Sequence, residues 1–123
     1  MLLEIRESTI DGVALLELNG KLALGRESQR IETLVDDFSR RQVTRVIFDM
    51  TGVNYIDSAG IGLLALAAGK LKEGGGKLVV VSPAASRTTQ LLKLTQMNAI
   101  VPLCETVAEA LGAFGLAQPP ASA

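Results

Sequence analysis

The first residues of the chain alternate between apolar and charged side chains, as a strand with one buried face does. Residues 3–7 read Leu, Glu, Ile, Arg, Glu and predict such a strand. Asp11-Gly12 is a turn signal, and the largely apolar residues 13–18 predict a second strand that Asn19-Gly20 ends. We therefore expect an antiparallel hairpin at the N-terminus.

The spacing of apolar residues becomes helical after residue 26. Ile31, Leu34, Val35 and Phe38 follow the i, i+3, i+4, i+7 pattern among charged residues, which predicts an amphipathic helix over residues 26–41. Further helices are expected over three later segments, residues 58–73, 82–96 and 105–114, the first of them ended by three consecutive glycines.

Short apolar runs separate these helices. Residues 45–50, 77–81 and 100–103 predict strands covered on both faces, and residues 51–57 are expected to form a loop. The order β-β-α-β-α-β-α-β-α indicates a single α/β domain with a mostly parallel sheet, an antiparallel N-terminal edge and packed helices. We expect the domain to span residues 1–116, followed by a flexible tail over residues 117–123.

Composition and charge exclude several functions. With 48% hydrophobic but only 3% aromatic residues, the core must be aliphatic. Twelve basic and thirteen acidic residues give a net charge of −1 without a basic patch, so we expect no nucleic-acid partner. No apolar run reaches the roughly 20 residues that cross a bilayer, and the N-terminus is no signal peptide, so we expect a cytoplasmic protein without membrane contact.

The residues needed for common catalytic centres are also missing. The chain has no histidine, which excludes Ser-His-Asp hydrolysis and most zinc sites. Its one cysteine, Cys104, cannot form an internal disulfide, suits a reducing compartment and is expected to be an inert core residue. We therefore predict a protein that is not an enzyme and holds neither a cofactor nor a metal.

The segment from Asn54 to Gly62 carries the candidate chemistry. It joins an apolar strand to a helix, at the carboxyl edge where α/β sheets gather ligands and partners. Ser58 is expected at the N-cap of that helix with Asp57 before it, and a serine there is most often only a cap. Its position between an acid and small residues also makes its hydroxyl accessible to another protein.

Other motifs for this segment do not fit. A nucleophile elbow needs glycine two residues before the serine, where Ile56 stands. Gly60-x-Gly62-x-x-Ala65 matches a dinucleotide fingerprint only formally, because its glycines lie inside the predicted helix and no acid follows about 20 residues on. Asp49 lacks the further acids that a magnesium-dependent response regulator needs.

The helix that follows is apolar on more than one side. One predicted face should meet the sheet, and the other apolar residues either pack under a neighbouring helix or form an exposed partner surface beside Ser58. The sheet-facing set is Ile61, Leu64, Ala65, Ala68 and Leu71, and the second set is Ala59, Gly62, Leu63 and Leu66.

These residues resemble a known family. The segment 57–62 (Asp-Ser-Ala-Gly-Ile-Gly), after the strand at 46–49, is similar to the phosphorylation segment of STAS-domain anti-sigma-factor antagonists. Residues 19–22 (Asn-Gly-Lys-Leu) resemble the family's Gly-x-Leu turn. Residues 91–95 and 100–103 resemble its third helix and last strand.

The resemblance implies a bacterial regulator of transcription that works by partner switching. Such a protein binds an anti-sigma factor, often a serine kinase with its own ATP, and so frees a sigma factor. The kinase phosphorylates the serine matching Ser58, which breaks the complex, and a serine phosphatase restores it. The implied partner-binding residues are Asp57, Ser58, Ala59, Gly60, Gly62, Leu63, Leu66, Gly20, Leu22 and Ala23.

Ala23 departs from the family pattern, which often has aspartate or another polar residue directly after Gly-x-Leu. An alternative function therefore stays open. The chain is then a family member with a different regulation, a scaffold module of a larger signalling complex or of a transporter-associated assembly. We expect a monomer or a weak homodimer.

Overall fold

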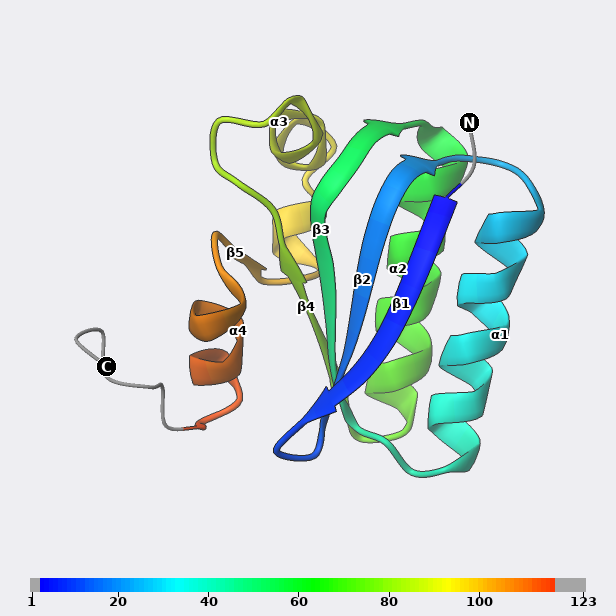
Figure 1. Cartoon of the computed structure of the whole chain (residues 1–123), viewed down its shortest axis with the longest axis vertical. Coiled ribbons are helices and arrows are strands. Elements are labelled where there is room, and N and C mark those ends of the chain that lie inside the picture. The colour runs from blue at the N-terminus through cyan, green and yellow to red at the C-terminus, as the bar shows by residue number, and fades with distance from the viewer. Residues whose placement is uncertain (1–2, 117–123) are drawn as a thin grey trace.

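A five-stranded sheet forms the centre of the molecule (Figure 1). The computed structural model describes residues 3–116, apart from the side chains of residues 26 and 27. The strands lie in chain order, with β1 antiparallel to β2 and all other neighbours parallel. They are β1 (Leu3–Ile10), β2 (Val13–Leu22), β3 (Arg45–Ile56), β4 (Lys77–Val81) and β5 (Leu103–Cys104).

Helices cover both faces of this sheet. In Figure 1, α1 and α2 lie side by side against one face, and α4 lies on the other. The predicted α/β class and element order are thereby confirmed for the described residues. The expected tail, residues 117–123, lies outside them. The helical elements are α1 (Arg26–Arg40), α2 (Ser58–Glu73), α3 (Arg87–Leu94), the 3-10 turn η1 (Met97–Ala99) and α4 (Val107–Ala113).

The N-terminal hairpin closes at the predicted turn. Asp11 and Gly12 both adopt positive φ, 50° and 80°, as the tight turns of two-residue hairpins require. Ile10 then pairs with Val13, and the register continues to Leu3 opposite Gly20. A short turn with this handedness matches the twist of the two strands.

Strands β2 and β3 are longer than the sequence pattern predicts. Asn19-Gly20 does not end β2, and residues 51–56 belong to β3 rather than to a loop. The two extensions pair across two register shifts, with Asn19 beside Gly52 and Leu22 beside Ile56. Since the backbone bonds come from the neighbouring strand, no apolar pattern is needed, and the extension brings Leu22 and Ile56 to the start of α2.

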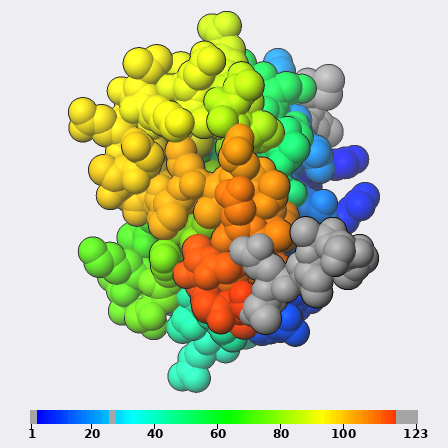
Figure 2. All heavy atoms as spheres, turned by 90° about the vertical axis from the view of Figure 1, so that its left-hand side faces the viewer, coloured from blue at the N-terminus to red at the C-terminus, as the bar shows by residue number. Residues whose placement is uncertain are grey.

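The C-terminal elements are shorter than predicted. Helix α3 begins after Ser86, which caps the Thr89 amide at 3.1 Å, and not at residue 82. The fifth strand is residues 103–104 instead of 100–103, because residues 97–99 form the turn η1. Helix α4 begins after Thr106, whose hydroxyl accepts from the Glu109 amide. Figure 2 shows this side of the molecule, with α3 and η1 in yellow and α4 in orange to red.

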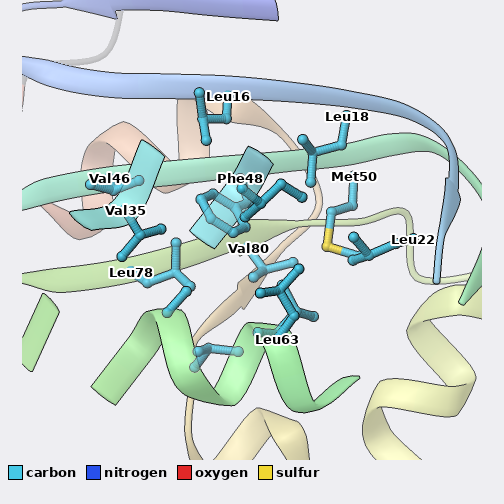
Figure 3. Close-up of a cluster of buried hydrophobic side chains, with 14 of the residues drawn as sticks. Leu16, Leu18, Leu22, Val35, Val46, Phe48, Met50, Leu63, Leu78 and Val80 are labelled. Atoms are coloured by element: carbon cyan, nitrogen blue, oxygen red, sulfur yellow. The ribbon is translucent and has the colours of Figure 1, made fainter. Parts of the chain in front are cut away.

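The larger core lies between the sheet and the pair α1 and α2. Figure 3 shows side chains from five elements meeting in it. A smaller cluster, around Ile47 and Leu111, lies under α4 on the other face. No helix within residues 3–116 is long and apolar enough to cross a membrane. The residues labelled in Figure 3 are Leu16, Leu18, Leu22, Val35, Val46, Phe48, Met50, Leu63, Leu78 and Val80.

Candidate functional site

The start of α2 is fixed by the residue before Ser58. Asp57, in extended conformation, is the N-cap, and its side chain accepts a hydrogen bond of 2.9 Å from the Gly60 amide. The prediction that Ser58 is the N-cap is therefore wrong: Ser58 is the first helical residue. Because Asp57 does the capping, the Ser58 side chain is not needed for it, and it is exposed to solvent.

The same end of α2 lies directly on the end of β2. The Asp57 amide donates to the Leu22 carbonyl oxygen at 3.4 Å. A Cβ added at Gly60 would overlap that oxygen and come within 2.9 Å of Ile56 Cγ1. Only a glycine allows this approach. Gly60 is itself buried, so it positions Ser58 instead of offering a contact surface.

The orientation of α2 decides which of its apolar residues are buried and which are exposed, a question that the sequence left open. Leu63 is only 8% exposed and packs in the main core, so its place in an exposed patch is wrong. Gly62 and Leu66 are exposed, the latter by 42%, and Ala59 is half-buried. Of the expected sheet-facing residues, Leu64 and Leu71 are buried, while Ile61, Ala65 and Ala68 are half-buried. Of the second set, Leu63 is therefore packed inside, whereas Gly62 and Leu66 belong to an exposed surface beside Ser58.

The loop between β2 and α1 adds a large exposed apolar side chain beside those of α2. Leu24 is 85% exposed, the highest value among the large apolar side chains of the described residues. It lines a shallow groove of about 300 Å³ with Ala59, Gly62 and Leu66, and Glu32 of α1 lies on the groove's wall. We call Ser58, Ala59, Gly62, Leu66 and Leu24 the Ser58 surface.

Three residues expected from the Gly-x-Leu turn have different roles. Leu22 is fully buried, so it anchors the end of β2 and cannot contact a partner, contrary to the prediction. Gly20, with φ of 115°, allows the strand irregularity, and Ala23 is half-buried. Sequence analysis did not single out Leu24, although an apolar residue between a predicted strand and a predicted helix was a usable signal.

Ion pairs hold α1 against α2 beyond this groove. Lys70 Nζ lies 2.6 Å from Asp36 Oδ1 and 4.0 Å from Glu32 Oε1. The hydrogen bond to Asp36 raises the pKa of Lys70 above its ordinary value. Lys70 is therefore charged at neutral pH. The pair therefore links α1 and α2 at their solvent-exposed sides.

The described residues offer no cluster of three side chains able to hold a metal ion. Gly60 and Gly62 lie inside α2, as expected, and not in a turn before it. The glycine pattern therefore does not form a dinucleotide-binding loop. What the site presents is a reachable hydroxyl at a helix N-terminus beside a small apolar surface.

Comparison with known proteins places this arrangement in a family. The family model for the STAS domain matches residues 4–110. A proposed anti-sigma factor antagonist of Thermotoga maritima is 24% identical over 102 residues, which are 83% of this chain and 89% of that protein. A homologue from Thermotoga neapolitana matches to the same extent. The chain therefore belongs to the STAS domain family.

Solved structures show the same fold. The crystal structure of the proposed antagonist from Thermotoga maritima has a TM-score of 0.81 at 22% identity, covering 91% of this chain and 95% of that one. The anti-sigma factor antagonist SpoIIAA, unphosphorylated, has a TM-score of 0.71 at 17% identity, over 93% and 98% of the chains. The murine anion transporter Slc26a9 contains a similar domain, with a TM-score of 0.69 over 89% of this chain and 19% of the transporter, at 18% identity.

Proposed function

We propose that this protein is an anti-sigma factor antagonist. It binds an anti-sigma factor, itself a serine kinase, through the Ser58 surface and so releases a sigma factor. The observation that carries the proposal is an exposed serine at the first position of α2, next to exposed apolar residues of α2 and of the β2–α1 loop. The protein acts as a cytoplasmic binding module and kinase substrate, as a monomer or weak homodimer, and not as an enzyme.

The fold tolerates a phosphate on Ser58. The first amides of a helix have no acceptor within it, and Asp57 occupies only that of Gly60. A phosphate there meets unused N–H groups and the positive end of the helix dipole. SpoIIAA supports this reasoning, because its phosphorylated form matches this chain with a TM-score of 0.70, nearly that of the unphosphorylated form.

Phosphorylation of Ser58 should, in contrast, lower the affinity of the partner for this protein. A phosphoserine carries about −1.5 to −2 charges at neutral pH. A partner docked over Ala59, Gly62 and Leu66 removes water from this charge. None of these three residues carries a cation that could pair with it. A loss of about 3–4 kcal/mol corresponds to a 100- to 1,000-fold weaker complex.

The test uses phosphate mimics and the anti-sigma factors of the native host. Ser58→Asp and Ser58→Glu should keep the fold by circular dichroism and lose binding in calorimetric titration, whereas Ser58→Ala should bind constitutively. Ser8→Asp is the matched control, since Ser8 is an exposed serine in the half of β1 away from Ser58. Equal binding by all four variants would refute the switch.

Modification itself is measured separately. The chain is incubated with ATP and each serine kinase among the anti-sigma factors, and its mass is then determined. We expect the gain of one phosphate, absent in Ser58→Ala and removed by a host serine phosphatase. A phosphate mapping to another residue, or none with kinases that modify a known substrate, contradicts the proposal.

The alternative function is a STAS module of a transporter-associated or scaffold assembly. The match with a transporter domain over 89% of this chain favours it as the second candidate. Pull-down from the native host distinguishes the two. Recovery of an anti-sigma factor supports the antagonist, and recovery of a transport ATPase subunit without any anti-sigma factor supports the alternative.

A further inference from the structure

A second surface feature lies near the other end of α2. A groove of about 550 Å³ runs between the C-terminal half of α2 and the segment from η1 to β5. Figure 2 views this side, with the yellow atoms around η1 above the green end of α2. Its walls include Lys72, Lys77, Ala68, Ala99, Ile100 and Pro102, and we call it the lysine groove.

Among the residues that the structure describes, the only charged ones lining this groove are two lysines. Lys72 and Lys77 are both exposed, and none of the ion pairs found within residues 3–116 includes either of them. The Lys77 ammonium lies 6.0 Å from the centre of the Phe114 ring, a contact that leaves its charge in place. The groove therefore presents two positive charges without a carboxylate of its own, although the whole chain carries −1.

The opposite wall is mostly apolar, with the polar Asn98 at its start, and is open to solvent. Ile100 is 56% exposed, Ala99 is exposed, and Pro102 is half-buried. An exposed β-branched side chain beside free cations fits a ligand that has both an apolar group and negative charges. A nucleic acid fits less well, because it would need a broader basic surface and gains little from an isoleucine.

We propose that the lysine groove binds an acidic peptide segment of a partner protein. Carboxylates of the segment pair with Lys72 and Lys77, and an apolar side chain between them packs on Ile100. Lys72 lies roughly 21 Å from Ser58 along the axis of α2, given its rise per residue. The two surfaces can therefore be occupied together. This inference rests on the charges of the groove and is independent of the function proposed for Ser58.

The test uses a synthetic peptide of alternating leucine and glutamate, capped at both ends, and the same peptide with glutamine for glutamate. Titration of the isotope-labelled full chain is followed by amide NMR shifts. With the acidic peptide we expect shifts at Lys72, Lys77 and residues 98–101, and not at residues 58–66. Binding should weaken as NaCl is raised from about 0.05 to about 0.5 M.

Variants identify the groove. Lys72→Glu combined with Lys77→Glu should weaken binding by roughly tenfold or more, and Ile100→Ser by a smaller factor. Lys93→Glu, an exposed lysine of α3 outside the groove, is the matched control and should bind as the parent does. All substituted side chains are exposed, so circular dichroism should show an unchanged fold.

Several outcomes overturn the inference. They are the absence of shifts with the acidic peptide, equal binding of the glutamine peptide, tighter binding of an oligonucleotide at the same residues, and an equal effect of Lys93→Glu. Ser58→Asp should bind the acidic peptide unchanged. This result separates the two proposals, because loss of the anti-sigma factor by Ser58→Asp leaves the groove untouched, and failure of the groove leaves the Ser58 switch untouched.

Discussion

Gly60 is the residue that sets the distance between α2 and the end of β2. Substituting it with alanine would drive a Cβ into the Leu22 carbonyl oxygen, which belongs to backbone and cannot rotate away. We expect Gly60→Ala to lower the free energy of unfolding by about 1–3 kcal/mol, the usual effect of overpacking. The measurement is urea denaturation followed by circular dichroism.

Gly62 supplies the control on the same helix. A Cβ there meets nothing within 4 Å. Gly62→Ala should therefore raise the unfolding free energy, by up to about 1 kcal/mol, because alanine has the higher helix propensity. If both variants changed stability in the same direction, the contact between Gly60 and Leu22 would not be what determines the effect of Gly60→Ala.

Cys104 offers a chemical test at the residue scale. Burial, followed by the negative charge of Glu109, raises the pKa of its thiol above the ordinary value, while Lys77 opposes the shift. A raised pKa leaves less thiolate at a given pH, and the thiolate is the reactive form. We expect iodoacetamide at about pH 8 to alkylate the native chain more slowly than the urea-unfolded chain. Faster reaction of the native chain would contradict this assignment.

At the residue scale, the sequence located Ser58 at the start of a helix but misassigned its role. Serine and aspartate are both good caps, so composition could not decide between Asp57 and Ser58. The burial of Leu63 was likewise undecided, because α2 is apolar on several sides and only its contact with the main core selects the inward face.

At the element scale, helix α3 depends on a buried hydroxyl cluster. Ser82 and Thr89 are each 2% exposed, and their hydroxyls are hydrogen-bonded to each other. Thr89 also bonds the Ser86 hydroxyl at 2.9 Å and the Pro83 carbonyl oxygen at 2.6 Å. These bonds hold residues 83–86 out of the helix, which explains why α3 starts later than its sequence predicts.

Thr89→Val tests this cluster with little change of shape. The valine cannot bond Ser82, Ser86 or Pro83, so we expect a loss of about 1–3 kcal/mol of unfolding free energy. Hydrogen exchange should increase in α3 more than in α2. Thr33→Val, which removes an exposed hydroxyl bond on α1, should change stability by less than about 0.5 kcal/mol. Equal losses from both would refute a specific role for the cluster.

Strand ends were the least predictable elements. Periodicity identified β1, β4 and the centre of β3, because these segments bury apolar side chains. It missed residues 51–56, where Thr51, Asn54 and Tyr55 are exposed, only Val53 and Ile56 are buried, and pairing with β2 extends the strand. Pairing is a property of two distant segments, and local sequence does not report it.

At the scale of the whole molecule, the Ser58 surface is assembled from two segments far apart in sequence. Leu24 comes from the β2–α1 loop and Leu66 from α2, and both line one groove. Because Leu24 is 85% exposed, Leu24→Ala should leave the thermal unfolding temperature unchanged. If this leucine is an anchor for the partner, the complex should weaken by roughly thirtyfold, which corresponds to about 2 kcal/mol.

Leu94 is the matched control for Leu24. It is 79% exposed at the end of α3, outside the groove that Leu24 and Leu66 line. Leu94→Ala should bind the anti-sigma factor as tightly as the parent in the same calorimetric titration. A similar loss of affinity with both variants would show a general effect of surface hydrophobicity. No loss of affinity with either variant would show that Leu24 is not part of the interface.

The sequence by itself determined the α/β order, the hairpin turn and the position of Ser58, because each depends on local periodicity or on turn and capping residues near in sequence. Only the tertiary structure decided which apolar residues of α2 are exposed, how far β2 and β3 extend, and that Leu24 lies beside Leu66. These features depend on contacts between segments distant in the chain, whose energies no local pattern contains.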